Sequence, residues 1–222
     1  EYYMFEKDLF PLAQVEFKAV NNKIISIEAL DGAEDIYYKV PDFRICKIKV
    51  KTENNLFKGF DTKLNAILFN EKTIKGTEED ILLRFKKEFD ASDPDILWIE
   101  NGNLVIPYLK EKFKYVNIDF NFNRFEKDDF GFKQGEHYFS YSRVVFRTHS
   151  IFLKGRLHFD IRSFFADDTG FHGILDGARI CRQRIQRTEM RSAGAAVTNF
   201  LLYTAHKNNF LLPYKVGIIE RF

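Results

Sequence analysis

The strongest constraint on the fold is an alternation of strand-like and helix-like segments between residues 43 and 113. Residues 43–51 place apolar side chains on one face and mainly lysines on the other, which predicts a strand in a half-buried sheet. Residues 64–69 predict its partner strand. A helix is expected after Thr77, because this N-cap residue precedes three acids and then apolar residues at helical spacing.

The same alternation continues beyond this helix. Asp93-Pro94-Asp95 should end the helix, and residues 96–99 predict a short buried strand. Asn101-Gly102-Asn103 predicts a turn, and a second helix is expected to begin near Pro107, since proline suits the first helical position. The order strand, helix, strand, helix predicts an α/β class with a mixed sheet and crossover connections.

Segments outside this region predict fewer elements. Residues 15–20 and 23–27 predict two strands around an Asn21-Asn22 turn. Two further strands are predicted, over residues 138–147 and 157–161. Two further helices are predicted, over residues 173–180 and 192–208.

Composition excludes some functional classes. The net charge of +2 is too small to favour nucleic-acid binding by bulk electrostatics. Cys46 and Cys181 are far apart and lack metal-site spacing, so free thiols and a cytoplasmic location are expected. No apolar run reaches the length of a membrane span and the first residues carry no signal-peptide pattern, so no membrane partner is expected.

Several segments, taken in order, resemble family B DNA polymerases of archaeal type. They are Phe5–Ala13, Phe43–Lys51, the stretch from Asp93-Pro94-Asp95 to Pro107-Tyr108-Leu109, Gly155–Asp160, and Arg191–Gly194 with Leu212–Lys215. The resemblance implies a ribonuclease-H-like exonuclease fold, a mixed sheet with helices, preceded by a remnant of a β-rich N-terminal domain. It divides the chain into residues 1–41 from the N-terminal domain, 42–190 as the exonuclease-like domain, and 191–222 as a helix leading towards the palm.

The same resemblance implies a lost nuclease site. The family's exonuclease holds two divalent metals with carboxylates, and its first motif places an Asp and a Glu two residues apart, where this chain has Lys49 and Lys51. The second motif's Asp aligns with Val105. The third motif needs a Tyr and an Asp at helical spacing, and no Tyr occurs between Asp160 and Gly194. The chain thus resembles the group with inactivated exonuclease motifs.

No metal cofactor is therefore expected for this fragment, whereas an intact parent polymerase would use Mg²⁺. Asp119, Asp128-Asp129 and Asp167-Asp168 leave open a metal site elsewhere. Residues 160–165 superficially resemble a palm motif, but the Pro-Ser pair and the Asp-Thr-Asp turn of the palm are missing. Asp160 is thus expected to be a structural residue at a strand end, and this chain alone should not polymerise DNA.

Local basic residues are the candidates for DNA contact. Arg179, Arg182, Arg184, Arg187 and Arg191 fall within thirteen residues, and guanidinium groups suit phosphate. The alternative is a solvated helix face with internal salt bridges. The predicted nucleic-acid-binding residues are Arg184, Arg187, Arg191, Ser192, Lys207 and Lys215. Tyr138, Phe139, Tyr141 and Phe146 are candidates for stacking on unpaired bases, or for cross-strand packing.

The sequence thus predicts a non-catalytic exonuclease-like domain of a family B DNA polymerase. Its expected partners are primer–template or single-stranded DNA, the rest of the polymerase chain, and replication proteins. Two alternatives remain: a protein-interaction scaffold in a replication assembly, and an active nuclease with relocated metal ligands.

Overall fold

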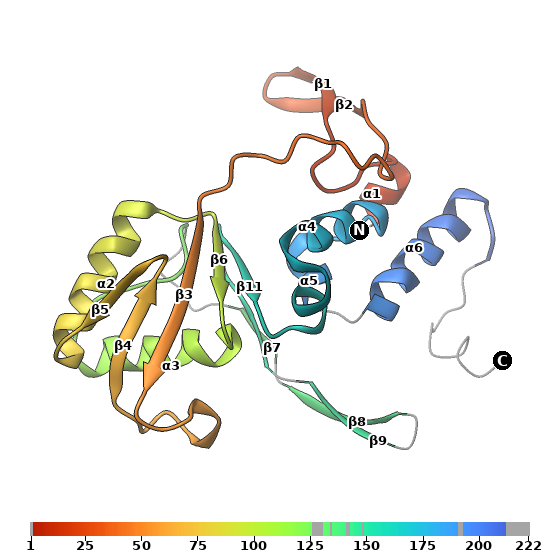
Figure 1. Cartoon of the computed structure of the whole chain (residues 1–222). Helices are drawn as coiled ribbons and strands as arrows, with labels where there is room; N and C mark the ends of the chain where they lie inside the picture. The colour runs from red at the N-terminus through yellow and green to blue at the C-terminus, as the bar shows by residue number, and fades with distance from the viewer. Residues whose placement is uncertain are drawn as a thin grey trace. The chain divides into compact units, whose positions relative to one another are not determined.

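The computed structural model describes residues 2–125, 131–133, 135–140, 143–147, 149–190 and 193–211. The chain forms two compact units (Figure 1). Unit 1 comprises Glu1–Pro41 and Phe164–Phe222, and unit 2 comprises Asp42–Ser163. The division into domains 1–41, 42–190 and 191–222 stays a prediction.

Unit 2 contains a five-stranded mixed sheet. Its strands are β3 (Ile45–Thr52), β4 (Leu64–Phe69), β5 (Lys72–Lys75), β6 (Ile96–Ile99) and β11 (Leu157–Asp160), in the order β11-β6-β3-β4-β5. β11, β6 and β3 run parallel, while β4 and β5 are antiparallel to their neighbours. The predicted strands 43–51, 64–69, 96–99 and 157–161 are therefore confirmed to within two residues at each end.

Two helices, α2 (Glu78–Ser92) and α3 (Gly102–Tyr115), cover the same face of this sheet, which lies in front of them in Figure 1. Cys46 and Ile48 of β3 point into this interface and are buried with Phe85 and Phe89 of α2. The alternation in residues 43–51 thus correctly predicts which face of β3 is buried. Burial of these side chains is the main force that holds the sheet and helices together.

The start of α2 is as predicted. The Thr77 side chain accepts a hydrogen bond from the Asp80 amide, and the Asp80 carboxylate accepts one from the Thr77 amide in return. This capping box satisfies two amide groups that the helix leaves without partners. At the other end, Asp93 adopts a left-handed conformation with φ 36°, and Asp93-Pro94-Asp95 ends the helix as expected.

The prediction for the start of α3 is wrong. The helix begins at Gly102, and Pro107 lies inside it, so Asn101-Gly102-Asn103 opens the helix. The reason is a distant residue. Asp160, at the end of β11, accepts hydrogen bonds from the Asn103 amide at 3.2 Å and from the Asn103 side chain at 3.3 Å. The first turn of α3 is thus stabilised by Asp160 from β11, and the position of Pro107 does not determine where the helix begins.

Two small antiparallel pairs complete the described strands of unit 2. β7 (Gly131–Lys133) pairs with β10 (Ser150–Phe152), and β8 (Glu136–Ser140) pairs with β9 (Arg143–Arg147). A short 3-10 helix, Leu56–Lys58, lies between β3 and β4. The prediction of one strand over 138–147 is correct only in part, because residues 138–140 and 143–147 belong to two different strands that pair with each other.

Unit 1 combines a hairpin with helices. Strands β1 (Val15–Val20) and β2 (Lys23–Ala29) are antiparallel, and Asn21 and Asn22 between them have φ of 51° and 60°. Such left-handed pairs favour tight hairpins, so this prediction is confirmed. The helices are α1 (Tyr2–Glu6), α4 (Phe164–Ile180), α5 (Ile185–Glu189) and α6 (Ala193–Lys207).

Of the two helices predicted in unit 1, one is confirmed and the other begins earlier than predicted. α6 agrees with the predicted helix 192–208. α4 begins at Phe164 and not at residue 173, because the helical stretch continues across a non-helical break at Gly170 with φ 65°. Cys46 and Cys181 are free and buried. Among the described residues, no helix is long and apolar enough to span a membrane.

Candidate site at the carboxyl end of the sheet

The face of β3 that points away from α2 and α3 carries lysines. Lys47, Lys49 and Lys51 are exposed and alternate with Cys46 and Ile48, which point into the core. Lys49 and Lys51 are two of the three positions at which the resemblance implies lost metal ligands. Both therefore lie on one accessible surface of unit 2.

Lys49 is held by an acid that the sequence analysis did not single out. Glu100 follows β6 directly, and its amide donates to the Ile48 carbonyl at 3.3 Å. The Glu100 carboxylate lies 2.6 Å from Lys49 Nζ and 2.9 Å from Arg162 Nη2. We call Lys49, Glu100 and Arg162 the carboxyl-end cluster, because Glu100 and Arg162 follow the carboxyl ends of β6 and β11.

The electrostatics of the carboxyl-end cluster favour an anion over a metal ion. Hydrogen bonds from Lys49 and Arg162 lower the pKa of Glu100, so this group is a carboxylate at neutral pH. Two cations surround this one carboxylate. A divalent metal ion needs several oxygen ligands, and nearby cations would repel it. The side chains at this position do not fit a catalytic Mg²⁺ or Mn²⁺.

The third position of the predicted lost site lies elsewhere in unit 2. Val105 is on α3, is 3% exposed and belongs to the hydrophobic core between the sheet and the helices. Lys49 and Lys51 point to the opposite face of the sheet. The structure thus brings two of the three positions onto one surface and leaves Val105 in the core.

Asp160 has a structural environment. It is 6% exposed, and burial raises its pKa despite hydrogen bonds from backbone amides at the start of α3 and from Arg162. His158, two residues earlier on β11, is fully buried, and burial lowers its pKa to about 4. Both residues face the helices, and they fix the junction between β11 and α3.

The other acids proposed as relocated metal ligands do not assemble into a site within the described residues. Asp119, Asp167 and Asp168 are exposed. No group of three or more histidine, cysteine or acidic residues in the described part of the chain could hold a metal ion. Asp128 and Asp129 lie outside the described residues.

The arginine-rich segment of unit 1 is divided between buried and exposed positions. Arg179 is completely buried: it donates to Asp31 at 2.8 Å and to the Leu12 and Gly32 carbonyls, and its guanidinium lies 3.8 Å from the centre of the Tyr38 ring. The expectation of one solvated basic face is therefore wrong for Arg179, which fastens the N-terminal segment to α4.

Arg182 is buried in a similar way. Its guanidinium lies 3.5 Å from the centre of the Tyr203 ring and donates to Asp8 at 2.9 Å. Lys207 also donates to Asp8, at 3.1 Å. Burial would raise the pKa of Asp8, but hydrogen bonds from Tyr203, Lys207 and Arg182 outweigh this effect and lower it to about 2.

The predicted nucleic-acid-binding residues have different accessibility. Arg184 is exposed and serves as the N-cap position of the five-residue α5, and Arg187 is half-buried. Lys207 is exposed but is paired with Asp8. Arg191, Ser192 and Lys215 lie outside the described residues, as do the side chains of Tyr138, Phe139, Tyr141 and Phe146.

Comparisons with known proteins complete the description. No protein-family model matches the chain, and no curated protein sequence matches it. Its fold is similar to the solved structure of the family B DNA polymerase from the hyperthermophilic archaeon Pyrobaculum calidifontis. The TM-score is 0.62 at 12% sequence identity, and the match covers 93% of this chain and 35% of that one.

This likeness confirms the predicted fold class. The mixed α/β sheet with its helices matches a region of a family B DNA polymerase and is consistent with the ribonuclease-H-like fold expected from the sequence. The chain spans about a third of the length of that polymerase. The likeness to this region of the polymerase therefore concerns the fold alone.

Proposed function

We propose that this chain is a non-catalytic 3′–5′ exonuclease-like region of a family B DNA polymerase of the archaeal, inactivated-exonuclease type. Its role is to support the polymerase architecture and to bind primer–template DNA during replication or repair. The observation that carries the proposal is Lys49, a cation bound to Glu100 at 2.6 Å on the face where the resemblance implies metal-binding carboxylates.

The physical reason is charge. A two-metal nuclease generates its hydroxide and orients its substrate through carboxylate-bound cations. An ammonium group in a ligand's place both removes the ligand and repels the metal. Mg²⁺ belongs in this proposal only to the polymerase site of the parent protein. The proposed partners are primer–template or single-stranded DNA, the rest of the polymerase chain and replication proteins, and the proposed location is the cytoplasm.

DNA binding by unit 1 is proposed for Arg184, Arg187, Arg191, Ser192, Lys207 and Lys215. Arg184 supports this choice because it is exposed, unlike Arg179 and Arg182. Lys207 would need to exchange Asp8 for a phosphate oxygen. Arginine suits this role because its planar fork pairs with two phosphate oxygens at once.

The test uses the whole chain. Fluorescence anisotropy with a labelled primer–template should show binding that weakens steeply as salt rises, because phosphate contacts release counterions. In the same samples, Mn²⁺ should give no binding heat by calorimetry and no degradation of single-stranded DNA. Metal-dependent degradation would contradict the non-catalytic role, and absence of DNA binding at low salt would contradict the DNA-binding role.

A matched variant makes the calorimetry more informative. Lys49→Asp with Lys51→Glu restores carboxylates on the exposed face and leaves the core intact, whereas Val105→Asp would bury a carboxylate in the hydrophobic core. Gain of Mn²⁺ binding by the double variant would support the proposed origin of this face. Equal heats from both proteins would contradict it.

The second candidate is a protein-interaction scaffold, favoured by the exposed apolar residues of one element. The β1–β2 hairpin exposes large apolar side chains, including Phe17, Val20, Ile24 and Ile25. Exposed apolar groups gathered on one element are typical of a contact with another protein surface. A chain that binds no DNA but whose Phe17→Ser and Ile25→Ser variant loses a polymerase partner would favour this candidate.

A further inference from the structure

We propose that the lysine-bearing face of the unit 2 sheet is a binding surface for single-stranded nucleic acid. This surface, the lysine face, comprises Lys47, Lys49, Lys51 and Lys75, with Trp98 beside them. The inference rests on the proposed DNA-binding function, but it places a contact in a different unit from Arg184 and its neighbours.

Strand geometry brings these lysines together. Side chains two residues apart on a strand share a face and stand about 6.6 Å apart, so Lys47, Lys49 and Lys51 form a straight row. Lys51 lies opposite Ala66, and Ala66 lies opposite Lys75 on β5. Residues directly opposite each other share a face, so Lys75 extends the row across two strands.

The lysine face has a strong excess of positive charge. The residues of the five described strands that point to this side include no acid. They are Ile45, Lys47, Lys49, Lys51, Ala66, Leu68, Thr73, Lys75, Ile96, Trp98, Leu157 and Phe159. Glu100, just beyond β6, is shared by Lys49 and Arg162.

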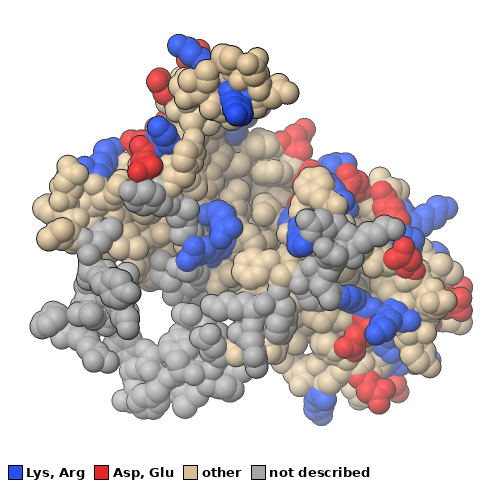
Figure 2. All heavy atoms as spheres, turned by 180° about the vertical axis from the view of Figure 1, so that it is seen from behind, with Lys and Arg blue, Asp and Glu red and all other residues tan. Residues whose placement is uncertain are grey.

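Three of the lysines are available to a ligand. Lys47, Lys51 and Lys75 are exposed and form no ion pair with any residue that the structure describes. By contrast, two lysines on the helix side of the sheet are paired: Lys72 with Glu88 at 2.8 Å and Lys86 with Asp90 at 3.0 Å. On the side of the molecule shown in Figure 2, basic and acidic groups are interspersed. The lysine face therefore differs from that charge-balanced surface.

Trp98 gives the lysine face an aromatic group. It is the register partner of Lys47 in the neighbouring strand, is partly exposed, and meets the buried Phe159 edge-on with ring centres 5.8 Å apart. Sequence-tolerant single-strand binders combine a basic track with aromatic rings that stack on bases. A linear row of charges beside a ring suits one extended strand, whose bases are free to stack, better than a duplex.

The experiment uses Trp98 as a built-in probe, because it is the single tryptophan of the chain. The whole chain is titrated with a fluorescently labelled oligothymidylate, and tryptophan emission and label anisotropy are recorded together. Both signals should saturate at the same oligonucleotide concentration, with Trp98 emission quenched, and the affinity should fall as salt rises.

Matched variants locate the contact. Lys47→Gln, Lys51→Gln and Lys75→Gln together should weaken binding by about tenfold or more and reduce the salt slope by about 2, since each lost phosphate contact on a single strand contributes about 0.7. The control removes the same charge from the helix side, as Lys72→Gln, Lys86→Gln and Lys87→Gln, and should change affinity by less than about twofold.

Each failure has a distinct meaning. Binding seen by anisotropy without quenching, and unaffected by the lysine-face variant, would overturn this proposal and leave DNA binding through unit 1 standing. No binding to oligothymidylate or primer–template would overturn both. Equal affinity for polyglutamate would overturn the choice of nucleic acid and identify the lysine face as a site for acidic polymers.

Discussion

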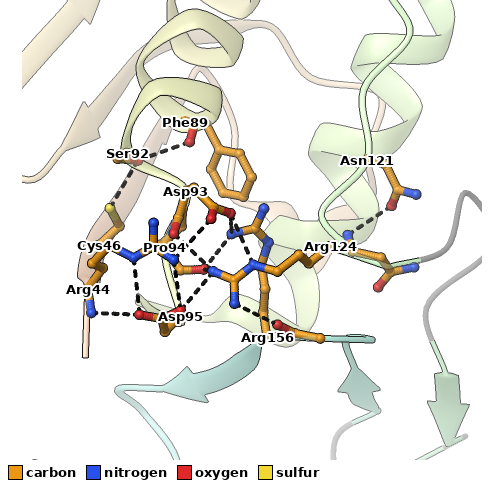
Figure 3. A network of polar contacts seen from close by, with 12 residues as sticks. Arg44, Cys46, Phe89, Ser92, Asp93, Pro94, Asp95, Asn121, Arg124 and Arg156 are labelled. Carbon is orange, nitrogen blue, oxygen red and sulfur yellow. Dashed lines mark hydrogen bonds and ion pairs between the residues drawn. The ribbon is translucent and has the colours of Figure 1, made fainter. Parts of the chain in front are cut away.

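Unit 2 carries a charged cluster at each end of its parallel strands, and the two clusters differ in how deeply the fold depends on them. At the amino ends, Asp93 and Asp95 are bound by Arg44, Arg124 and Arg156 (Figure 3). We call these five residues the amino-end cluster. At the carboxyl ends, Glu100 is bound by Lys49 and Arg162.

Burial and the number of contacts separate the two clusters. The Arg156 side chain is 7% exposed, lies 4.9 Å from the centre of the Phe89 ring and donates to the Pro94 carbonyl. Arg124 donates to the Asp93, Pro94 and Gly155 carbonyls. In the carboxyl-end cluster, Lys49 and Arg162 are 53% and 63% exposed. Arg44 of the amino-end cluster is also 53% exposed, so the difference between the clusters lies in Arg124 and Arg156.

The difference indicates which charges serve folding. The amino-end cluster ties the end of α2 to the starts of β6 and β11, so its arginines satisfy backbone groups that would otherwise lack partners. Ion pairs whose cations are exposed, such as those that Lys49 and Arg162 form with Glu100, contribute little to stability. Folding therefore places little constraint on the residue types at the carboxyl end, and these residues can contribute to ligand binding.

The largest expected effect comes from Arg156→Ala. It should lower the free energy of unfolding by about 3 kcal/mol, because it removes a side chain that is 7% exposed, packs against the Phe89 ring and binds Asp93 and the Pro94 carbonyl. Urea unfolding followed by Trp98 fluorescence measures unit 2 directly. Arg162→Ala is the matched control and should cost less than about 1 kcal/mol. Equal costs would remove the distinction between the clusters.

The second prediction concerns pH. Burial lowers the pKa of His158 to about 4, whereas an unfolded histidine has a pKa near 6.5. The unfolded chain therefore binds the proton first as pH falls, and the free energy of unfolding should decrease between about pH 6.5 and pH 4, by up to about 3 kcal/mol.

The carboxylates of both clusters respond in a lower range. The pKa values of Asp93, Asp95 and Glu100 are all lowered, so their stabilising effect persists until the pH falls below the usual range of these acids. Urea unfolding at pH 7 and pH 5 tests the histidine contribution, which the raised pKa of Asp160 opposes as the pH falls. His158→Gln should flatten this part of the profile, and an unchanged slope would refute the assignment.

The third prediction tests the packing between β11 and α3. A Cβ added at Gly102 would lie 2.0 Å from His158 Nε2, so Gly102→Ala should cost about 1–3 kcal/mol through overpacking. The double variant with His158→Ala provides space for the new methyl group. It should be less destabilised than the sum of the two single variants, whereas strict additivity would show that the groups do not meet.

Local sequence patterns predicted the elements whose causes are local. The Asn21-Asn22 turn, the alternation along β3 and the capping box at Thr77 each depend on residues within a few positions. The break after α2 is another such case. For these elements the side chains that determine the conformation are adjacent in the chain, so the prediction needed no knowledge of the tertiary fold.

Features that depend on distant residues were missed. α3 begins at Gly102 because Asp160, 57 residues after Asn103, binds its first turn. Arg179 and Arg182 resembled surface charges because their acids, Asp31 and Asp8, are 148 and 174 residues away. Glu100 directly follows the predicted strand 96–99, but the sequence analysis did not pair this strand with residues 43–51, so the contact between Glu100 and Lys49 was missed as well.

The smallest expected effect on stability, Glu100→Gln, is the sharpest test of the comparison. Loss of this half-buried carboxylate, whose two partners are exposed, should change the free energy of unfolding by less than about 1 kcal/mol. Yet it releases Lys49 and Arg162 and removes a negative charge beside the lysine face, so affinity for oligothymidylate should rise by about threefold with a steeper salt dependence. Glu88→Gln, which frees Lys72 on the helix side, removes the same charge and should leave affinity unchanged. If both variants raised the affinity equally, the gain would reflect the net charge of the protein alone. That result would contradict a direct contribution of the carboxyl end of the sheet to oligonucleotide binding.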